Sequence, residues 1–179
     1  MKKLLLLLVI AALGVLGCLK TREPSRDAPG VPCFPDLSGE SLSGKKYAFP
    51  ADFGSKKTLV LFAYSQDQAD QLSSWVGGLD LLRSEINWYE TPVISKPLKV
   101  GRFFIDRGMR DGIPDSRIRD RVVTLYTDRE AFSKSLGIPY DPEGAYALVL
   151  DSSGSLVGFV SGGYDQEKGK KILELLRRP

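Results

Sequence analysis

Residues 57–75 place a buried strand directly before an amphipathic helix, and this junction limits the chain to a small set of folds. Residues 58–64 form a short apolar run rich in β-forming residues, which predicts a central strand covered on both faces. Ser65 stands where a helix N-cap belongs, and Gln68 completes a capping box. Four apolar residues then follow at the spacing of one helix face: Leu72, Trp75, Val76 and Leu79.

The rest of the chain alternates strands with helices and closes on a strand hairpin and a helix. Further strands are predicted over residues 86–94, 122–126, 145–151 and 156–160, and further helices over 98–109, 128–136 and from Asp165 to the end. Pro92 lacks an N–H, so its strand should contain a bulge or lie at an edge. Gly108 and residues 111–114 should end their helix. This order predicts an α/β fold, a central mixed β-sheet flanked by helices.

The N-terminal residues have the pattern of a bacterial lipoprotein leader. Met1-Lys2-Lys3 is basic, and the apolar run over 4–16 is too short to cross a bilayer, which takes roughly 20 residues. Val15-Leu16-Gly17-Cys18 resembles a lipobox. We therefore expect a lipoprotein signal peptide over 1–17, lipidation of Cys18, a flexible tether over 18–32 and one domain over 33–179. Ordinary secretion with a coincidental cysteine and an uncleaved anchor are the alternatives.

This leader also predicts where the protein acts. A lipid on Cys18 would hold the domain in the bacterial cell envelope, facing the periplasm, with the membrane as its first partner. Leu19 follows Cys18 where inner-membrane lipoproteins carry aspartate, so the outer membrane is favoured over the inner one.

Composition excludes several classes of chemistry. The chain has no histidine, which rules out Ser-His-Asp and Cys-His catalysis and His-ligated zinc. It has two cysteines, and with Cys18 lipidated only Cys33 would be a free thiol, so no disulfide framework is expected. The net charge of +3 falls further when the leader is removed and gives no argument for nucleic acid. We predict no metal site and no cofactor.

The junction at Ser65 resembles that of thioredoxin-like redoxins, in which a Cys-x-x-Cys motif opens the helix and exchanges disulfides. The matching residues here are Asp67-Gln68-Ala69-Asp70, and carboxylates cannot exchange disulfides. Redoxins also carry a cis-proline whose position falls at Ala145. We expect Ala145 to be trans, because a non-proline cis bond costs roughly 3 kcal/mol. The resemblance thus implies a thioredoxin-like fold over 33–179 without disulfide exchange.

A narrower resemblance is to the mitochondrial ATP synthase assembly factors that act on a membrane-sector subunit. The residues that carry it, in sequence order, are Leu61-Phe62, Gln71, Ser74-Trp75, Gly108-Met109, Ile113-Pro114, Leu136-Gly137-Ile138, Gly144-Ala145-Tyr146, Leu150-Asp151 and Ser161-Gly162-Gly163. Those factors keep a redoxin fold without the dithiol motif. The resemblance therefore implies a chaperone that binds a membrane-associated protein, not a reductase.

If this resemblance holds, the vacant redox face is the partner-binding surface. It would comprise residues 65–70, 144–146 and 162–164, with six contact residues: Ser65, Asp67, Asp70, Ala145, Tyr146 and Tyr164. The predicted function is that of a lipid-anchored, non-catalytic envelope protein that binds or assists the assembly of a membrane-associated protein. Asp67 and Asp70 have a second interpretation, in which they only stabilise a helix N-terminus.

Two other interpretations remain open. Cys33 could make the protein a thiol oxidoreductase or peroxidase, or the protein could be a structural lipoprotein without an active partner. The arginines over 102–121 alternate with aspartates, which predicts a solvated ion-pair surface. Trp88 and Tyr89 are adjacent in a strand and face opposite ways, which would leave one of them exposed for a partner.

Overall fold

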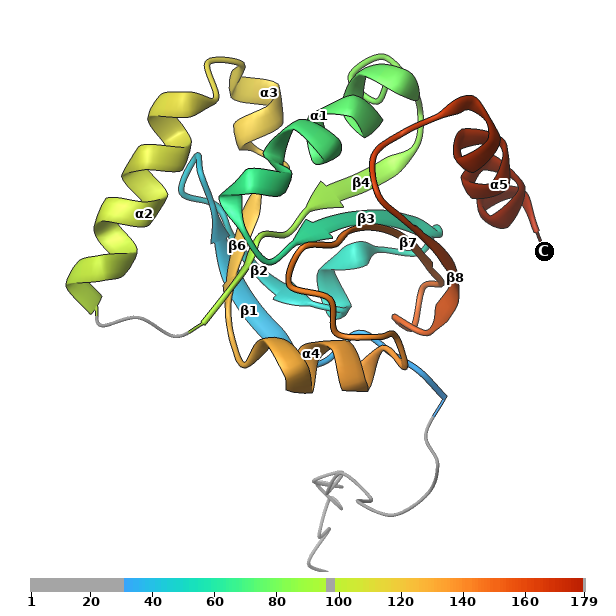
Figure 1. Ribbon diagram of the computed structural model, residues 1–179, viewed down its shortest axis with the longest axis horizontal. Helices are drawn as coiled ribbons and strands as arrows, with labels where there is room; N and C mark the ends of the chain where they lie inside the picture. Colours follow the sequence, from blue (N-terminus) through green and yellow to red (C-terminus); the bar gives the residue numbers. More distant parts are fainter. Residues whose placement is uncertain (1–30, 96–98, 179) are drawn as a thin grey trace, which may run out of the picture.

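The computed structural model describes residues 31–95 and 99–178, with the side chains of 99 and 100 left aside (Figure 1). The predicted signal peptide, Cys18 and nearly all of the predicted tether lie outside the described residues. Near the start of the described residues, the Pro32 carbonyl accepts a hydrogen bond from the Leu156 N–H at 2.8 Å. In the described part of the chain, no helix has the length and apolar character needed to cross a membrane.

The fold consists of strands and helices in alternation. The strands are β1 (Leu37–Ser41), β2 (Lys46–Phe49), β3 (Thr58–Ala63), β4 (Asn87–Glu90), β5 (Val93–Ile94), β6 (Val123–Tyr126), β7 (Ala145–Leu150) and β8 (Leu156–Ser161). The helices are α1 (Ala69–Gly78), α2 (Lys99–Gly112), α3 (Ser116–Arg119), α4 (Arg129–Ser135) and α5 (Gln166–Arg177), with short 3-10 helices η1 (Ala51–Phe53) and η2 (Gln66–Gln68).

Two four-stranded sheets meet along the segment that contains β4 and β5. One sheet has the order β4-β3-β7-β8, with β3 parallel to β4 and antiparallel to β7. The other has the order β2-β1-β6-β5, with β5 parallel to β6. Thr91 and Pro92 interrupt the segment, because Pro92 has no N–H to donate. The predicted interruption is confirmed, but the segment is central and not an edge, since Glu90 also bridges Val122.

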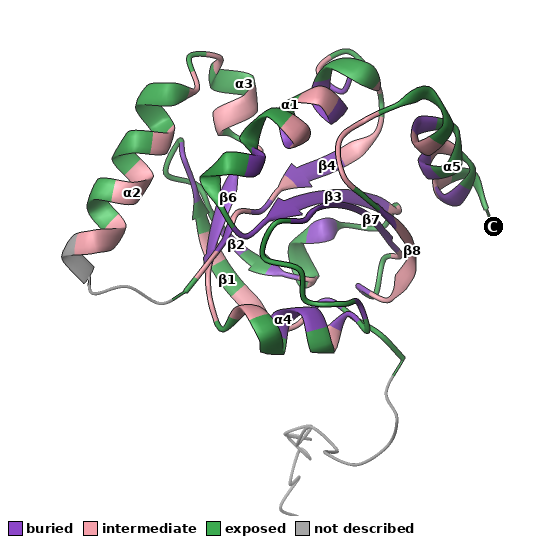
Figure 2. Ribbon diagram, viewed as in Figure 1, coloured by how far each residue is buried: buried purple, intermediate pink, exposed green. Residues whose placement is uncertain are grey.

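The central strands are largely buried (Figure 2), and apolar side chains pack against both faces of the sheet. Alternate residues of β3 point to opposite faces, as a strand requires. Leu59 and Leu61 pack with Trp75 of α1 and Ile172 of α5 on one face. Val60, Phe62 and Tyr64 pack on the other face with α4 and the N-terminal strands, in a second cluster that also includes Phe34, Phe49, Phe53, Phe132 and Leu136. The prediction of a mixed sheet with helices on both faces is confirmed.

Three details differ from the sequence-based expectation. β1 was not predicted, because its sequence is polar and only its pairing with β2 and β6 makes it a strand. α2 does not break at Gly108 and continues to Gly112. Trp88 and Tyr89 do face opposite ways, but both are buried, since helices or strands cover each face of the central sheet.

Candidate partner-binding groove

The junction between β3 and α1 has the predicted capped geometry. Ser65 Oγ accepts a hydrogen bond from the Asp67 N–H at 3.2 Å, and Gln68 Oε1 accepts one from the Ser65 N–H at 2.9 Å. This capping box begins with η2, which leads directly into α1. The side chains of Ser65, Asp67 and Asp70 are exposed at the end of the sheet where β3 stops.

The carboxylates of Asp67 and Asp70 do not form part of a metal-binding cluster. Among residues 31–95 and 99–178, no three His, Cys, Asp or Glu side chains come together in a way that would hold an ion. Both aspartates lie in the first turn of their helices, where a carboxylate is favoured by the helix dipole. Their placement fits both of the interpretations given to them above.

Ala145 and Tyr146 lie beneath this surface. Both side chains are buried in β7, where Ala145 pairs with Ala63 and the Tyr146 ring stacks on Phe62 at 4.8 Å. Of the peptide bonds in the described residues, only Phe49–Pro50 is cis, so Ala145 is trans as predicted. These two residues shape the edge from inside and do not present side chains to a partner in this structure.

The Tyr164 ring packs between helices α1 and α5. It lies edge-on against Trp75 at 5.4 Å, and the Tyr164 N–H donates to Ser74 Oγ at 2.8 Å. A Cβ at Gly78 of α1 would lie 2.3 Å from the ring, and one at Gly169 of α5 would lie 2.5 Å from it. The ring therefore fills the gap between α1 and α5 and is only partly available to a partner.

Cys33 lies at the opposite end of the sheet from Ser65. Its backbone bridges Ser155, just after the turn that joins β7 to β8, and its N–H donates to the Ser135 carbonyl at 3.0 Å. That turn follows Leu150, which pairs with Thr58 at the start of β3. The length of β3 therefore separates Cys33 from the Ser65 edge, roughly 20 Å at the rise of a β-strand. The thiol is free and exposed, and it cannot serve chemistry at that edge.

A groove of about 650 Å3 opens at the Ser65 edge, between α2 and the ends of the central strands. Its apolar wall comes from α2 and the residue after it, with Phe104, Ile105, Met109 and Ile113. Its polar wall comes from the sheet edge and the elements that follow it, with Tyr64, Ser65, Gln66, Glu90 and Arg129. The groove shares Ser65, Gln66 and Ala69 with the predicted partner-binding surface, and it contains none of residues 144–146 or 162–164.

Glu90 is the unusual ionisable group of the groove. It is partly buried at the end of β4, on the same strand face as Trp88. Burial raises the pKa of its carboxyl from an ordinary 4.5 to about 7. The groove therefore holds a carboxyl group that changes its charge near neutral pH.

Tyr64 and Arg129 form the other polar end of the groove. Burial raises the pKa of Tyr64 to about 12, while its hydrogen bond to Ser133 and the positive charge of Arg129 oppose the rise. The Nε atom of Arg129 is enclosed by protein and has no hydrogen-bond partner among the described residues. Tyr140 covers Tyr64 edge-on at 5.2 Å.

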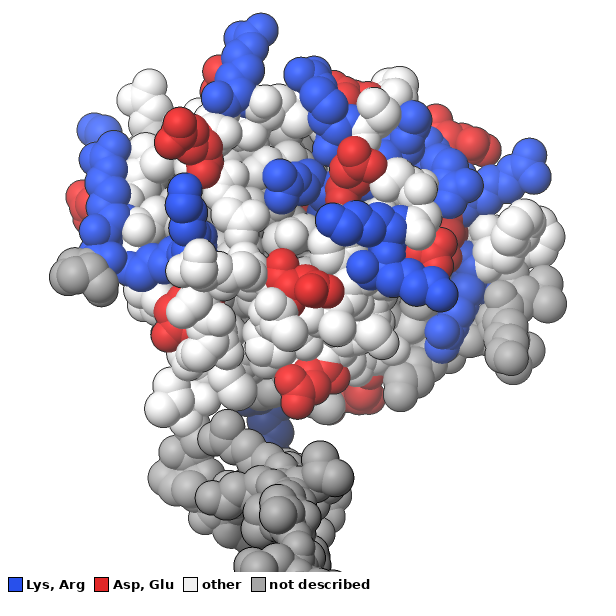
Figure 3. Space-filling view, turned by 180° about the vertical axis from the view of Figure 1, so that it is seen from behind, with Lys and Arg blue, Asp and Glu red and all other residues white. Residues whose placement is uncertain are grey.

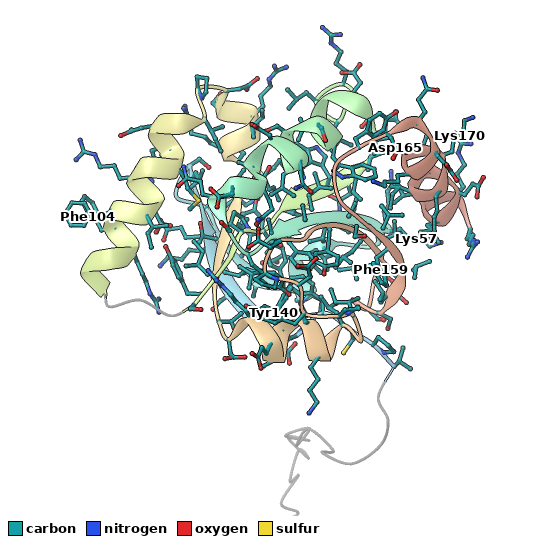
Figure 4. The ribbon with its side chains drawn as sticks, viewed as in Figure 1. Lys57, Phe104, Tyr140, Phe159, Asp165 and Lys170 are labelled. Atoms are coloured by element: carbon teal, nitrogen blue, oxygen red, sulfur yellow. The ribbon has the colours of Figure 1, made fainter. Side chains whose placement is uncertain are left out.

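α2 carries an exposed aromatic pair, Phe103 and Phe104, of which Phe104 also lines the groove. Phe103 is 61% exposed and Phe104 is 66% exposed, and their rings meet edge-on at 5.7 Å. Figure 4 shows Phe104 projecting outward from α2, away from the sheet. Neither ring belongs to the hydrophobic clusters of the described residues.

The arginines over 102–121 form a mixed surface. Arg117 pairs with Asp115 at 2.7 Å, and this hydrogen bond lowers the pKa of Asp115 to about 2. Arg107 lies 3.8 Å from Asp111. Seen from behind, acidic side chains lie among the basic ones (Figure 3). This arrangement agrees with the predicted solvated ion-pair surface.

Neither a protein-family model nor a curated protein matches this sequence. Solved structures do match it. A putative electron transport protein from Aquifex aeolicus VF5 is 13% identical, with a TM-score of 0.58 over 82% of this chain and 98% of that one. Copper-bound yeast Sco1 is 16% identical, with a TM-score of 0.57 over 83% and 94%. The exposed lipoprotein thioredoxin Etrx1 from Streptococcus pneumoniae is 16% identical, with a TM-score of 0.52 over 78% and 98%.

The protein therefore has a thioredoxin-like fold, and the predicted fold class is confirmed. Its structural neighbours include thiol-disulfide oxidoreductases and members of the Sco family, which are redoxin-like assembly proteins. At these identities the likeness establishes the fold and carries no activity with it. At the edge where the resemblance to redoxins places a dithiol, this protein has Asp67 and Asp70 instead of cysteines. The edge can bind other groups, but it cannot exchange disulfides.

Proposed function

We propose that this protein is a lipid-anchored component of the bacterial envelope that binds a polypeptide segment of a membrane-associated protein and assists its assembly. The observation that carries the proposal is the groove between α2 and the Ser65 edge, which has an apolar wall and no thiol. A mostly apolar groove with a few polar groups is a typical ligand site.

The anchor and the assembly role have support outside the groove. The lipobox-like sequence before Cys18 supports a lipid anchor. One structural neighbour is an exposed lipoprotein, and another belongs to the Sco family of cytochrome c oxidase assembly proteins. The sequence pattern shared with ATP synthase assembly factors points the same way. The membrane that holds the anchor is proposed to be the outer one, from Leu19.

Site-specific photo-crosslinking in intact membranes tests this proposal. A photoreactive residue replaces Gln66, which is exposed at the groove, and in a matched variant it replaces Ser152, which is exposed in the turn at the opposite end of the sheet. We expect Gln66 to yield a discrete adduct with a membrane-associated protein and Ser152 to yield none. Identical adducts from both positions, or none from Gln66, would refute the proposal.

A substitution in the groove wall provides the second arm. Ile105→Glu places a charge on the apolar wall of the groove and should abolish the Gln66 adduct, because an apolar segment would then lie against a charge. The Ile105 side chain is only partly buried, so the variant should still fold. Ala51→Glu adds the same charge at an exposed site in η1 and should leave the adduct unchanged. Steady-state levels of the assembled partner complex, measured in a strain with Ile105→Glu, report on the assembly role.

A further inference from the structure

Among the described residues that line the groove, only Arg129 has an enclosed side-chain donor without a hydrogen-bond acceptor. It is the first residue of α4, it is partly buried, and its Nε has no partner in residues 31–95 and 99–178. The Nε of Arg102 is also unpartnered, but that guanidinium stacks over the Tyr126 ring at 4.6 Å. Enclosed donors without acceptors are rare in folded proteins. The Nε itself is shielded by the fold, so an acceptor in the groove would meet the outer N–H groups of the same guanidinium, because Arg129 lines the groove.

No carboxylate of the described residues serves as the acceptor for Arg129. Arg129 forms no ion pair with any Asp or Glu in the described ranges. Glu90 lines the same groove, but burial is the sole cause of its raised pKa, and a nearby guanidinium would have lowered it. Arg129 therefore brings an uncompensated positive charge to one end of the groove.

The other residues that line the groove indicate the chemistry of the ligand that would carry this acceptor. Ile105, Met109 and Ile113 form an apolar wall, and Ser65 and Gln66 place a hydroxyl and an amide at the rim. An apolar wall suits aliphatic side chains, and the polar rim suits the N–H and C=O groups of a peptide backbone. A volume of about 650 Å3 suits a short peptide segment.

We propose that the groove binds an apolar polypeptide segment that carries one carboxylate, and that this carboxylate pairs with the Arg129 guanidinium. A guanidinium presents parallel N–H donors that match the two oxygens of a carboxylate. The chemistry is the same for the C-terminal carboxylate of a polypeptide and for an Asp or Glu side chain. This inference rests on the proposed function, in which the groove binds a partner polypeptide, and it adds the feature by which the partner is recognised.

Peptide binding to the full-length protein in detergent tests the inference. The probes are fluorescein-labelled, leucine-rich hexapeptides in three forms: free C-terminal acid, C-terminal amide, and amide with one internal aspartate. Fluorescence anisotropy gives the dissociation constants. We expect the amide without aspartate to bind about tenfold or more weakly than at least one of the two carboxylate forms, and the stronger of those forms identifies the source of the carboxylate.

Substitutions then assign the effect to Arg129. Arg129→Gln should remove the preference for a carboxylate, and Arg129→Lys should reduce it, because lysine keeps the charge but lacks the fork. Arg177→Gln makes the same change at an exposed site in α5 and should keep the full preference. An equal loss with Arg177→Gln would mean that net charge alone attracts the peptide and would overturn the inference.

The unmodified protein provides a test that does not depend on the variants folding. Equal affinity for all three peptides would refute carboxylate recognition and leave the groove as a peptide site, so the proposed function would stand. Binding of decanoate with no binding of any peptide would assign the groove to a fatty acid and overturn the inference. Absence of both the Gln66 adduct and peptide binding would refute the proposed function itself.

Discussion

Replacing Glu90 by glutamine should stabilise the protein at alkaline pH and much less at acidic pH. The fold raises the pKa of this carboxyl from 4.5 to about 7, so the folded state favours the protonated form. The contribution of Glu90 to stability is therefore fully present below pH 4.5 and is lost as the pH rises through 7. Wild-type stability should fall over this range relative to Glu90→Gln.

The size of the effect follows from the shift. A rise from 4.5 to about 7 corresponds to about 3 kcal/mol at full ionisation. Glu90 keeps some exposure to the groove, which reduces the loss to between about 1 and 3 kcal/mol at pH 8. At pH 5 the carboxyl is mostly protonated, and the cost is below about 1 kcal/mol. The neutral amide carries the same burial cost at both pH values.

Urea unfolding at pH 5 and pH 8 measures this difference. The buried Trp75 and Trp88 provide the fluorescence signal, and the protein that begins at Val31 contains the whole described fold. The free energy of unfolding of Glu90→Gln minus that of the wild type should be about 1 to 2 kcal/mol larger at pH 8 than at pH 5. Glu85→Gln, at an exposed position, controls for the lost charge. An equal difference at both pH values would refute the reasoning.

Three further predictions concern the rest of the fold. Ser65→Ala removes one half of the capping box and should lower the unfolding free energy by about 1 kcal/mol in urea titrations. Gly78→Ala brings a methyl group against the Tyr164 ring and should cost about 1 to 3 kcal/mol, whereas Gly77→Ala meets nothing within 4 Å and should stabilise by up to about 1 kcal/mol; thermal melts of both variants test this. Hydrogen peroxide should oxidise Cys33 no faster than free cysteine, as followed by mass spectrometry, because it has neither a cysteine partner nor a histidine base; faster oxidation would revive the peroxidase interpretation.

Local sequence signals predicted those parts of the fold that depend on near neighbours. Ser65 and Gln68 interact three residues apart, and Asp128 and Asp165 cap α4 and α5 through N–H groups three residues further along. Such interactions are visible in the sequence because backbone geometry fixes the spacing. The turn before β8 was predictable for the same reason, since Gly154 adopts a positive φ of 84°.

The groove could not be predicted in this way. Tyr64, Glu90, Met109 and Arg129 come from four elements that only the tertiary fold brings together. The sequence placed the binding surface on Ala145 and Tyr146 because it indicates strand positions but not what covers a strand. One signal was available: Glu90 lies within the strand predicted over residues 86–94, directly after the aromatic residues Trp88 and Tyr89, and a carboxylate within a buried strand is rare.

The two walls of the groove differ in how firmly they are held, because α2 forms one wall and the buried sheet forms the other. None of the described side chains of α2 belongs to the two hydrophobic clusters. The helix is held by the Arg110 Nε bond to the Leu42 carbonyl at 2.7 Å, by the Tyr126 hydroxyl on Asp106 at 2.8 Å, and by Arg102 over Tyr126. A few contacts of this kind are worth about 1 kcal/mol each, far less than the buried core on the opposite wall.

We therefore expect the apolar wall to open without unfolding of the sheet, and the amides of α2 to exchange hydrogen well before those of β3 and β7. A groove with one fixed wall and one adjustable wall accepts segments of different bulk at the cost of tight selectivity. If the partner is a nascent or unassembled polypeptide, this tolerance would let the protein hold several successive conformations of one client and release it without a chemical step.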